Sequence, residues 1–587
     1  MQKDILEQIK QLAKENSVKP INDEEIEQLV LETEENLGRE LTGYGKLDKP
    51  HQQFYYDEAI NREYICNERI GSRVIKECQK RRTKIAYVLG ERKITYGELE
   101  ENIISVAYKL KELGIKKGDF ITMAALSTPE AIYVFFATSL IGAITRPIDP
   151  ISSPNSIKAN ILTTNSKILI TNDINFLKLK DITKGTNLES IIALPIEDAF
   201  SSKLSPEGVI FKTISKLSKK AISSQKNKWI KWADFLSNIP KDKLNLESIE
   251  EPYEEESIVS VLSTSGSTGE PRGVCLTDGN FILSVEKQMN SGFDVSHDEN
   301  MYNPMPTCSS YFWQDILLAI MYGVPTTLEP LFNAKKSAKA IMNADCSIVL
   351  AGPIIIEQLT EYINKTKTTE IISKKIKHVV SGGDLLSLIT ETKGNQALSK
   401  IKPTLKVENA LGTSETTGPA FNPNGIIADS RAYSIGSVGL ILPGDEYSIF
   451  AYDSEDDTRN IYEPGYDIGL KYYEVGEICF SAQNKNVFKE YFKNQSATAA
   501  TLVRHNDGTI WYHTGDLGYM DPAGFQYCSG RKSGLIVRDG HKIWSSKIER
   551  IVCLFEEVED CAIIGVEDLR EKEVPVLFIQ YKENISE

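Results

Sequence analysis

Short apolar runs alternate with longer amphipathic stretches along most of the chain. Residues 88–96 predict a strand–turn–strand hairpin, because two β-rich runs flank a glycine-containing turn. Residues 97–115 carry apolar positions at helical spacing and end beside a glycine, the usual pattern of an amphipathic helix. A strand over 116–126 follows, and then a buried helix begins at Pro129. This alternation predicts an α/β fold in which mostly parallel sheets carry helices on their faces.

Two regions depart from this alternation. At the N-terminus, Ile5, Ile9 and Leu12 recur at helical spacing, and a turn-rich break follows at residues 42–50. We interpret this region as a helical extension that packs on the main body, in preference to a docking module for a partner. Residues 176–250 are rich in Lys, Ser and Asn, and we expect a mobile surface excursion there.

The length of 587 residues exceeds what one hydrophobic core supports, so more than one domain is expected. We divide the chain into a helical extension over residues 1–50, a large N-terminal domain over 51–530, and a small lobe over 531–587. The large domain is expected to be a multi-lobed body of layered, mostly parallel sheets with helices, and the small lobe to be α+β. A polar break at residues 529–534 marks the last boundary.

Composition narrows the function classes. The net charge of −15 argues against a nucleic-acid binder, since such proteins are usually basic. The nine cysteines are scattered without any C-x-x-C pair, which favours reduced thiols over a disulfide frame or a zinc site. The N-terminus has no apolar signal core, and the longest apolar stretch, residues 131–144, is too short to span a bilayer. We therefore expect a cytoplasmic protein without a membrane span.

The segment STSGSTGEPRGVCLT, residues 263–277, is the strongest chemical signal. Its glycines and hydroxyl side chains suit neither a helix nor a central strand, and it directly follows an apolar strand-like run over 257–262. Such a turn directs backbone N–H groups and hydroxyls to one point, which is how proteins hold phosphates. A flexible linker is the alternative, but it explains neither the preceding strand nor Arg272. A P-loop kinase or NTPase is opposed by the missing Gly-Lys-Ser/Thr.

With LTDGN at 276–280, this segment resembles the phosphate-binding motif of the adenylate-forming acyl ligases. That family comprises acyl-CoA synthetases, carrier-protein loading domains and luciferases. Five further segments resemble the family's motifs in the right order, so that the resemblance covers roughly residues 50–587. They are 117–150, 379–386 (VVSGGDLL), 409–418 (NALGTSETTG), 434–444 (SIGSVGLILPG) and 512–537, which contains YHTGD and SGRKSG.

The resemblance implies ATP-dependent activation of a small-molecule carboxylic acid to an acyl-adenylate, with release of pyrophosphate. Thioester formation on CoA, or on the phosphopantetheine of an acyl carrier protein, would follow. Arg272 and Glu415 are the expected catalytic residues, Glu415 and Thr268 the expected Mg²⁺ ligands, and Ser533 the expected hinge. The expected nucleotide-binding residues are Ser265, Gly266, Ser267, Thr268, Gly269, Gly382, Gly383, Asp384, Gly412, Ser414, Asp516 and Arg531, with Asp516 accepting the ribose hydroxyls.

The chain departs from the family's pattern at several positions. Arg272 stands where relatives usually carry Lys, and the two are not equivalent in geometry. Leu411 replaces an aromatic residue that would stack on adenine, Asp278 replaces a common His, and Ser533 replaces a hinge Asp or Lys. A catalytically weakened nucleotide-binding or scaffold homologue is therefore the alternative function. Pyrophosphate release with a panel of carboxylic acids distinguishes the alternatives.

The acyl pocket is expected to involve Trp313, Leu411 and Gly412. Gly412 sits where acetate-specific relatives place a pocket-closing Trp, which predicts room for more than two carbons. Trp313 is a candidate pocket wall, with core packing as the equal alternative. No acidic residue occupies the place where amino-acid-activating relatives bind the substrate ammonium, although Asp315 is close. This favours a plain carboxylic acid.

The last expectation concerns the small lobe. In the family this lobe continues beyond the part matched by residues 558–587 and carries a Gly-Lys motif, whose lysine bridges the carboxylate and the α-phosphate. No lysine near the end of the sequence has such a context, and Lys582 reads as a solvent-facing lysine. We therefore expect an incomplete lobe and slow adenylation by this form of the chain, with transfer from pre-formed acyl-adenylate retained.

Overall fold

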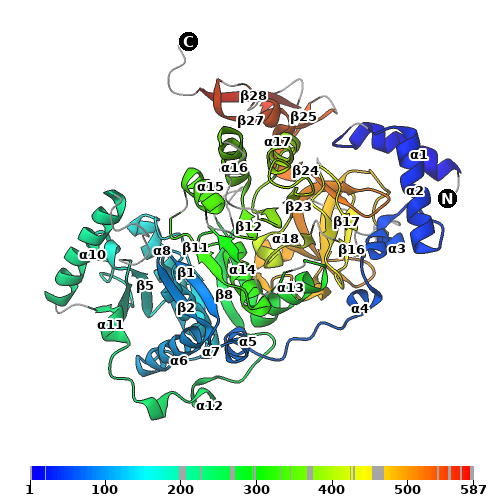
Figure 1. Cartoon of the computed structure of the whole chain (residues 1–587). Coiled ribbons are helices and arrows are strands. Elements are labelled where there is room, and N and C mark those ends of the chain that lie inside the picture. The colour runs from blue at the N-terminus through cyan, green and yellow to red at the C-terminus, as the bar shows by residue number, and fades with distance from the viewer. Residues whose placement is uncertain are drawn as a thin grey trace.

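The computed structural model describes residues 3–19, 21–196, 206–224, 228–264, 271–293, 295–296, 299–331, 333–343, 346–366, 375–422, 425–427, 430–452, 468–538, 541–552, 555, 557–568 and 572–581. Two large sheets and a third, antiparallel sheet make up the main body, and a small red lobe lies apart from it in Figure 1. The expected α/β fold with a small C-terminal lobe is confirmed.

The first large sheet has eight strands. Its strands from β8 to β7 are mutually parallel, while β9 and β21 add an antiparallel edge. The central strands are apolar and buried on both faces, as parallel sheets between helices require. In spatial order the strands are β21 Glu490–Tyr491, β9 Gly273–Thr277, β8 Ile258–Ser263, β4 Ile144–Pro147, β3 Phe120–Ala124, β5 Ile168–Asn172, β6 Ser190–Leu194 and β7 Trp229–Lys231.

The second large sheet has seven strands and is parallel except at β2. Its strands, in spatial order, are β14 Val407–Asn409, β13 His378–Ser381, β12 Ile348–Ala351, β10 Met301–Asn303, β11 Thr326–Leu328, β1 Ile85–Leu89 and β2 Arg92–Thr95. The helices of the two layers are α5 Ile70–Gln79, α6 Tyr96–Glu112, α7 Pro129–Leu140, α8 Pro154–Thr164, α13 Asp278–Asn290, α14 Ser310–Tyr322, α15 Ala334–Asn343, α16 Pro353–Lys365 and α17 Leu388–Leu398.

The third sheet is antiparallel and consists of β19 Tyr447–Phe450, β20 Gly476–Ser481, β23 Ile510–Met520, β22 Leu502–Arg504 and β24 Gln526–Arg531. A short turn, Lys532–Gly534, leads from β24 into the small lobe. That lobe holds β25 Leu535–Arg538, β26 His541–Trp544, α19 Ser545–Val552, β27 Val558–Asp568 and β28 Lys572–Tyr581.

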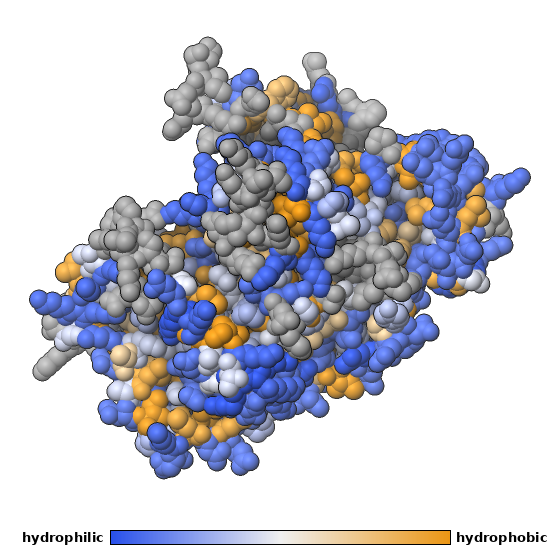
Figure 2. Space-filling view, viewed as in Figure 1, coloured by the Kyte–Doolittle hydropathy of each residue, from blue (hydrophilic) through white to orange (hydrophobic). Residues whose placement is uncertain are grey.

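Hydrophilic and hydrophobic residues intermingle over the face seen in Figure 2, with an orange patch at the small lobe. Apolar side chains of β27 and β28, such as Ile564 and Phe578, are exposed there. None of the described helices is long and apolar enough to cross a membrane. None of the described cysteines forms a disulfide bond.

The helical pattern at the N-terminus is confirmed by α1 (Lys3–Asn16) and α2 (Asp23–Leu37). A capping box between Asn22 and Glu25 starts α2, because each side chain accepts a hydrogen bond from the other residue's backbone N–H. Apolar residues of both helices belong to the main hydrophobic core. The Val18 N–H donates to the Tyr519 hydroxyl of β23 at 2.8 Å, so the helices pack directly on the third sheet.

The segment over residues 176–250 contributes more to the core than expected. It supplies the parallel strands β6 and β7 of the first sheet. The expectation of a surface excursion was therefore wrong for the strands, although Lys216 and Lys220 of α10 (Pro206–Ser224) are exposed. The remaining short elements are α3 Gly45–Asp48, α4 Asp57–Ile60, α9 Phe176–Leu179, α11 Trp232–Phe235, α12 Leu246–Ile249, α18 Gln495–Thr501, β15 Phe421–Asn422, β16 Gly425–Ile427, β17 Ser430–Ala432 and β18 Leu440–Ile441.

The burial of the N-terminal helices leads to a stability prediction. Ile26 is fully buried, so Ile26→Ala should lower the free energy of unfolding by about 2–5 kcal/mol through lost burial and a residual cavity. Leu31 lies on the same helix but is 64% exposed, so Leu31→Ala is the control and should change stability little. Denaturant unfolding measures both. A separate early transition in Ile26→Ala, with the main transition unmoved, would contradict packing of the extension on the body.

Candidate active site

A cavity of about 1470 Å³ lies where segments of all three main sheets converge. It is lined by the ends of β4 and β8, the start of β9, residues from β12 and β13, the loop after β14, and residues of β20, β21 and β23. The structure therefore brings together segments that are far apart in the sequence. The expected site residues that line the cavity are Arg272, Gly382, Gly383, Gly412, Ser414, Glu415, Arg531 and Ser533.

The glycine-rich loop begins and ends at the edge of this cavity. The expected phosphate-binding residues Ser265, Gly266, Ser267, Thr268 and Gly269 lie outside the described residues, but the base of their loop is described. The Thr264 N–H donates to the Arg272 carbonyl at 3.0 Å, and the Arg272 N–H donates to Thr264 Oγ1 at 3.1 Å. These two bonds continue the β8–β9 pairing, so the loop leaves and returns at one point.

Arg146, at the end of β4, is a cavity residue that the sequence analysis missed. Its guanidinium donates to the Val261 carbonyl at 2.8 Å, to Ser263 Oγ at 2.9 Å and to Asn160 Oδ1 at 3.1 Å. No carboxylate of the described residues pairs with it, and burial lowers its pKa to about 10. The sequence did contain a signal for Arg146, because a basic residue interrupts the apolar run of a strand there. Arg146 thus holds β8, the strand that leads into the glycine-rich loop. Its positive charge lies beside that loop without a carboxylate partner among the described residues.

Glu415 and Arg272 lie on either side of Tyr491. Glu415 sits in the short turn Ser414–Thr416, which a capping box from Thr413 begins. The Tyr491 hydroxyl donates to Glu415 Oε1 at 2.7 Å, which fixes the carboxylate in the buried lining. The Arg272 guanidinium lies over the Tyr491 ring, 5.2 Å from its centre. Tyr491, another residue missed from the sequence, therefore positions both expected catalytic side chains.

Asp516 and Arg531 face each other on adjacent strands. They are register partners in β23 and β24, and Arg531 Nε lies 3.0 Å from Asp516 Oδ1. Burial raises the pKa of Asp516 to about 6, although Arg531 opposes this shift. Gly515 and Thr514, the two residues before Asp516, line the cavity, so the expected ribose acceptor lies directly behind its wall.

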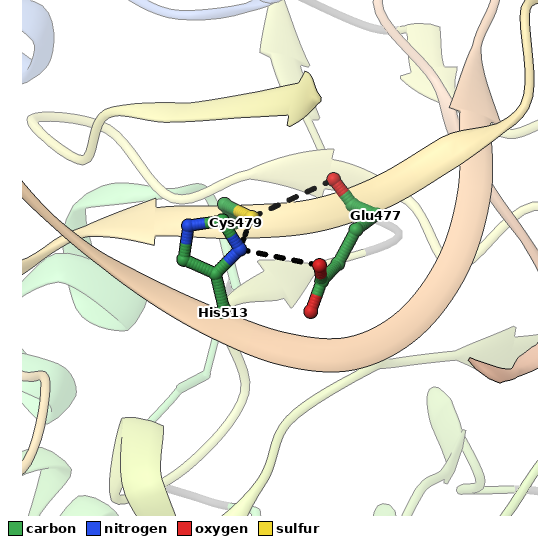
Figure 3. Close-up of side chains that lie close together, drawn as sticks. All are labelled: Glu477, Cys479 and His513. Atoms are coloured by element: carbon green, nitrogen blue, oxygen red, sulfur yellow. Dashed lines mark hydrogen bonds and ion pairs between the residues drawn. The ribbon is translucent and has the colours of Figure 1, made fainter. Parts of the chain in front are cut away.

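A buried cluster supports the turn that carries Asp516 (Figure 3). Glu477 Oε1 accepts from the Gly515 N–H at 2.9 Å, and Glu477 Oε2 lies 3.2 Å from His513 Nδ1. The Cys479 sulphur lies 3.3 Å from the same nitrogen. The carboxylate, thiol and imidazole are within 4.8 Å of one another, a set of atoms that could also hold a metal ion. The bond to Gly515, whose φ is +74°, fixes the backbone beside Asp516.

Three expected site residues lie elsewhere. Trp313 is fully buried and stacks on Phe135 with ring centres 3.8 Å apart, while its indole N–H donates to the Thr307 carbonyl at 2.7 Å. It is a core residue and does not line the cavity. Leu411 is also outside the lining, and its carbonyl accepts from two backbone N–H groups of the next strand. Asp384 is exposed and accepts from the Leu385 N–H at 2.7 Å.

Gly412 lines the cavity for a backbone reason. It forms an isolated β-bridge with Pro419, and a Cβ at position 412 would lie 2.2 Å from the Gly418 carbonyl oxygen. Only glycine permits this approach. The backbone contact alone therefore explains glycine at position 412. The size of the acyl pocket depends on other residues.

Comparisons with known proteins agree with this geometry. The family model of the AMP-binding enzymes matches residues 75–492, and the chain belongs to this family of adenylate-forming ligases. It is 24% identical to a 2-succinylbenzoate–CoA ligase of Bacillus cereus over 505 residues, covering 86% of this chain and 87% of that protein. It is 23% identical to a long-chain-fatty-acid–CoA ligase of Bacillus subtilis over 536 residues, covering 91% and 89%.

Solved structures share the fold. The o-succinylbenzoate CoA synthetase of Bacillus subtilis, in complex with the acyl-adenylate OSB-AMP, matches with a TM-score of 0.66 and 19% identity, over 89% of this chain and 90% of that one. ATP-bound MatB from Rhodopseudomonas palustris matches with a TM-score of 0.68 and 17% identity, over the same shares. Both likenesses support the arrangement of the body and the small lobe.

The raised pKa of Asp516 generates a prediction for nucleotide binding. If the ionised carboxylate accepts the ribose hydroxyls, ATP affinity should fall as the pH drops through about 6, by up to about tenfold per pH unit. The direction follows because protonation below this pKa replaces an acceptor by a donor. Calorimetric titration from pH 8 to pH 5, the range around that pKa, measures the slope.

Asp516→Asn is the matched control, because it keeps the size of the side chain and cannot ionise. The phosphates of ATP also titrate in this pH range. The variant therefore reports how much of the pH dependence of ATP affinity comes from the phosphates alone. The variant should bind ATP more weakly at neutral pH and with a shallower pH profile. Equal slopes in both proteins would show that Asp516 does not contact the ribose in its ionised form.

Proposed function

We propose that the chain activates a small carboxylic acid with ATP in this cavity and then transfers the acyl group to the thiol of CoA. One observation carries the proposal: a single cavity joins a cationic edge at the glycine-rich loop, the backbone beside a buried carboxylate, and a buried part that includes the apolar side chains of Phe293, Leu350 and Val380. These three parts match triphosphate, ribose and acyl group in turn.

The cationic edge suits the phosphates. Arg272 and Arg146 lie at the base of the loop, and Lys493 lines the same edge. Loop backbone N–H groups and nearby cations together bind phosphate oxygens well. Because Arg146 has no carboxylate partner among the described residues, a bound phosphate would supply the missing opposite charge.

The base and the ribose have a matching wall. Gly382 and Gly383 line the cavity beside the Tyr311 ring, and their missing side chains leave room for a planar base. Asp516 would accept the two ribose hydroxyls, with Arg531 holding the carboxylate in place.

The donor set also suits Mg²⁺ beside the phosphates. Glu415 offers a carboxylate oxygen within the cavity, and Tyr491 holds the other oxygen, so the group is fixed without being neutralised. Mg²⁺ prefers such oxygen ligands and usually binds through one or two carboxylates together with substrate phosphates. Glu415 would hold the ion, which neutralises phosphate charge when bound; Thr268, the other expected ligand, lies outside the described residues.

In both reactions the protein mainly positions the substrates and stabilises charge, and it forms no covalent bond to them. In the first, a substrate carboxylate oxygen attacks the α-phosphorus and pyrophosphate leaves, so negative charge develops on the phosphoryl oxygens. Arg272 is placed to stabilise that charge from the cavity edge. In the second, the CoA thiol attacks the acyl carbonyl and AMP leaves.

Ser533 is proposed as the hinge between the two reactions. It lies in the turn Lys532–Gly534 between the third sheet and the small lobe, and it is exposed at the rim of the cavity. A rotation there would move the lobe relative to the site without breaking a core contact. CoA is favoured over a carrier protein because the relatives named above are CoA ligases, and a cytoplasmic setting stays a prediction.

The role of Arg272 is open to a direct test. Arg272→Ala should lower the rate of pyrophosphate release by about 10²–10³, since it removes a cation directed at developing phosphoryl charge. Arg272→Lys should recover part of that loss. Arg504→Ala is the control, because Arg504 is exposed, does not line the cavity, and donates from its side chain to the Gly508 carbonyl. An unchanged rate in Arg272→Ala would remove this residue from the proposed chemistry.

The function itself is tested by a panel of carboxylic acids with ATP, measuring pyrophosphate, AMP and ADP. Acid-dependent pyrophosphate, followed by CoA-dependent AMP release and thioester, is the expected result. If a thioester forms on a carrier protein but not on CoA, the acceptor is the carrier protein and that part of the proposal is wrong. ADP would indicate a kinase or NTPase instead. ATP binding without any turnover would indicate the weakened homologue.

A further inference from the structure

The enclosed end of the cavity contains a buried acid without a partner. Asp315, in the middle of α14, is 0% exposed and belongs to the cavity lining. Among the described residues, neither of its carboxyl oxygens has a hydrogen-bond partner. Leaving a buried polar group unsatisfied costs about 1–3 kcal/mol, so native proteins rarely do so without a reason.

Asp315 and five other residues of the cavity lining make up what we call the inner pocket: Gln288, Phe293, Tyr311, Leu350 and Val380. Leu350 and Val380 are register partners on β12 and β13, and with Phe293 they form an apolar wall. Tyr311 precedes Asp315 by four residues on α14, so the two share one face of the helix.

No neighbouring group neutralises this acid. Burial alone raises the pKa of Asp315 well above its usual range, and no described cation opposes the shift. The nearby Gln314 amide donates to the Gln288 carbonyl and so is committed to another side chain. In the free protein, Asp315 is therefore a buried, unsatisfied polar group in the lining of the inner pocket.

A purely structural role does not account for Asp315. The N-cap of α14 is Ser309, whose side chain accepts from the Tyr311 N–H, so a mid-helix acid is not needed there. An apolar side chain of similar volume would remove the unsatisfied carboxyl and suit the surrounding core. What the acid adds is an unused hydrogen-bonding group in the lining of the inner pocket.

We propose that the acyl substrate carries a hydrogen-bond donor, an amine or a hydroxyl, on the part that enters the inner pocket, and that Asp315 binds this group. The inference rests on the proposed function and names its class of substrate. It revises the plain carboxylic acid expected from the sequence. The apolar wall of Phe293, Leu350 and Val380 would pack on the carbon skeleton that carries the donor.

The expected discrimination is large. A site built to hydrogen-bond a substrate OH or NH rejects the analogue that lacks it by about 10⁴–10⁵, because the buried partner is then left unpaired. The two donor types differ in charge. An amine would form an ion pair with the carboxylate, whereas a hydroxyl would form a neutral hydrogen bond.

Binding of intermediate analogues tests this without relying on turnover. Acyl-sulfamoyl adenosines are prepared in matched sets of increasing chain length and with aryl groups, each with a distal amine, a distal hydroxyl or neither. Calorimetry should show that at least one donor-bearing analogue binds at least about 100-fold more tightly than its unsubstituted parent. Pyrophosphate release with the corresponding free acids should follow the same order.

Variants locate the effect. Asp315→Leu should abolish the preference for the donor and raise the melting temperature of the free protein, because an unsatisfied buried carboxyl is removed. Asp315→Asn should keep part of the preference for a hydroxyl and lose that for an amine. Asp149→Asn is the matched control: Asp149 also lines the cavity but is exposed, so the preference should persist.

The outcomes separate this inference from the proposed function. If ATP and the unsubstituted analogues bind while no donor improves binding, the inference is overturned and the function stands. If Asp315→Leu keeps the preference for the donor, another residue binds that group and the inference is also overturned. If neither ATP nor any analogue binds, the proposed function fails and the inference fails with it.

Discussion

Ionisable side chains are buried where the three main sheets meet, and each of them needs a partner. Asp516 pairs with Arg531, Glu477 with His513 and the Gly515 N–H, and Glu415 with Tyr491. Burying a charge or a polar group without such bonds is costly. The pairs therefore fix the relative positions of the strands that carry them, and the cavity inherits its shape from those positions.

Strand β23 shows how this works. It pairs with β20, β22 and β24, so one strand links residues from three others. Its register places Asp516 opposite Arg531 and His513 opposite Cys479. A slip of one residue would turn each of these side chains to the other face of the sheet. The backbone pairing of β23 and its buried side-chain pairs thus favour the same register. The geometry of the site depends on that register.

Local patterns in the sequence were enough for the elements and for most of the cavity edge. The apolar run before the glycine-rich loop is β8, and the helical spacing in residues 3–37 is α1 and α2. Strands β6 and β7 were missed because each is a short run within a region rich in Lys, Ser and Asn. The N-terminal helices and the parallel sheets could be predicted from the periodicity of apolar residues alone, because that periodicity is a local property of the sequence.

The positions of Trp313 and Asp315 could not be obtained in the same way. Helix α14 is buried over nearly its whole length, so its sequence has no polar face that would distinguish the side toward the core from the side toward the cavity. The sequence therefore left Trp313 equally open to a pocket wall or a core position, and the structure shows that it packs on Phe135. That Asp315 lacks a partner is a property of the tertiary structure, because it depends on what α13, β12 and β13 place around it.

Two ionisable groups in the cavity lining lack an oppositely charged partner, and one is a base while the other is an acid. Arg146 lies at the loop edge without a carboxylate partner among the described residues, and Asp315 lies in the inner pocket without any described partner. An acid that carries a distal donor has complementary ends, since its carboxylate is attracted toward the arginines and its donor toward Asp315. The reverse orientation would place a carboxylate against a buried acid and a donor against cations. If Asp315 binds a substrate donor, as we propose, these two groups would favour such an acid and would set its direction in the cavity.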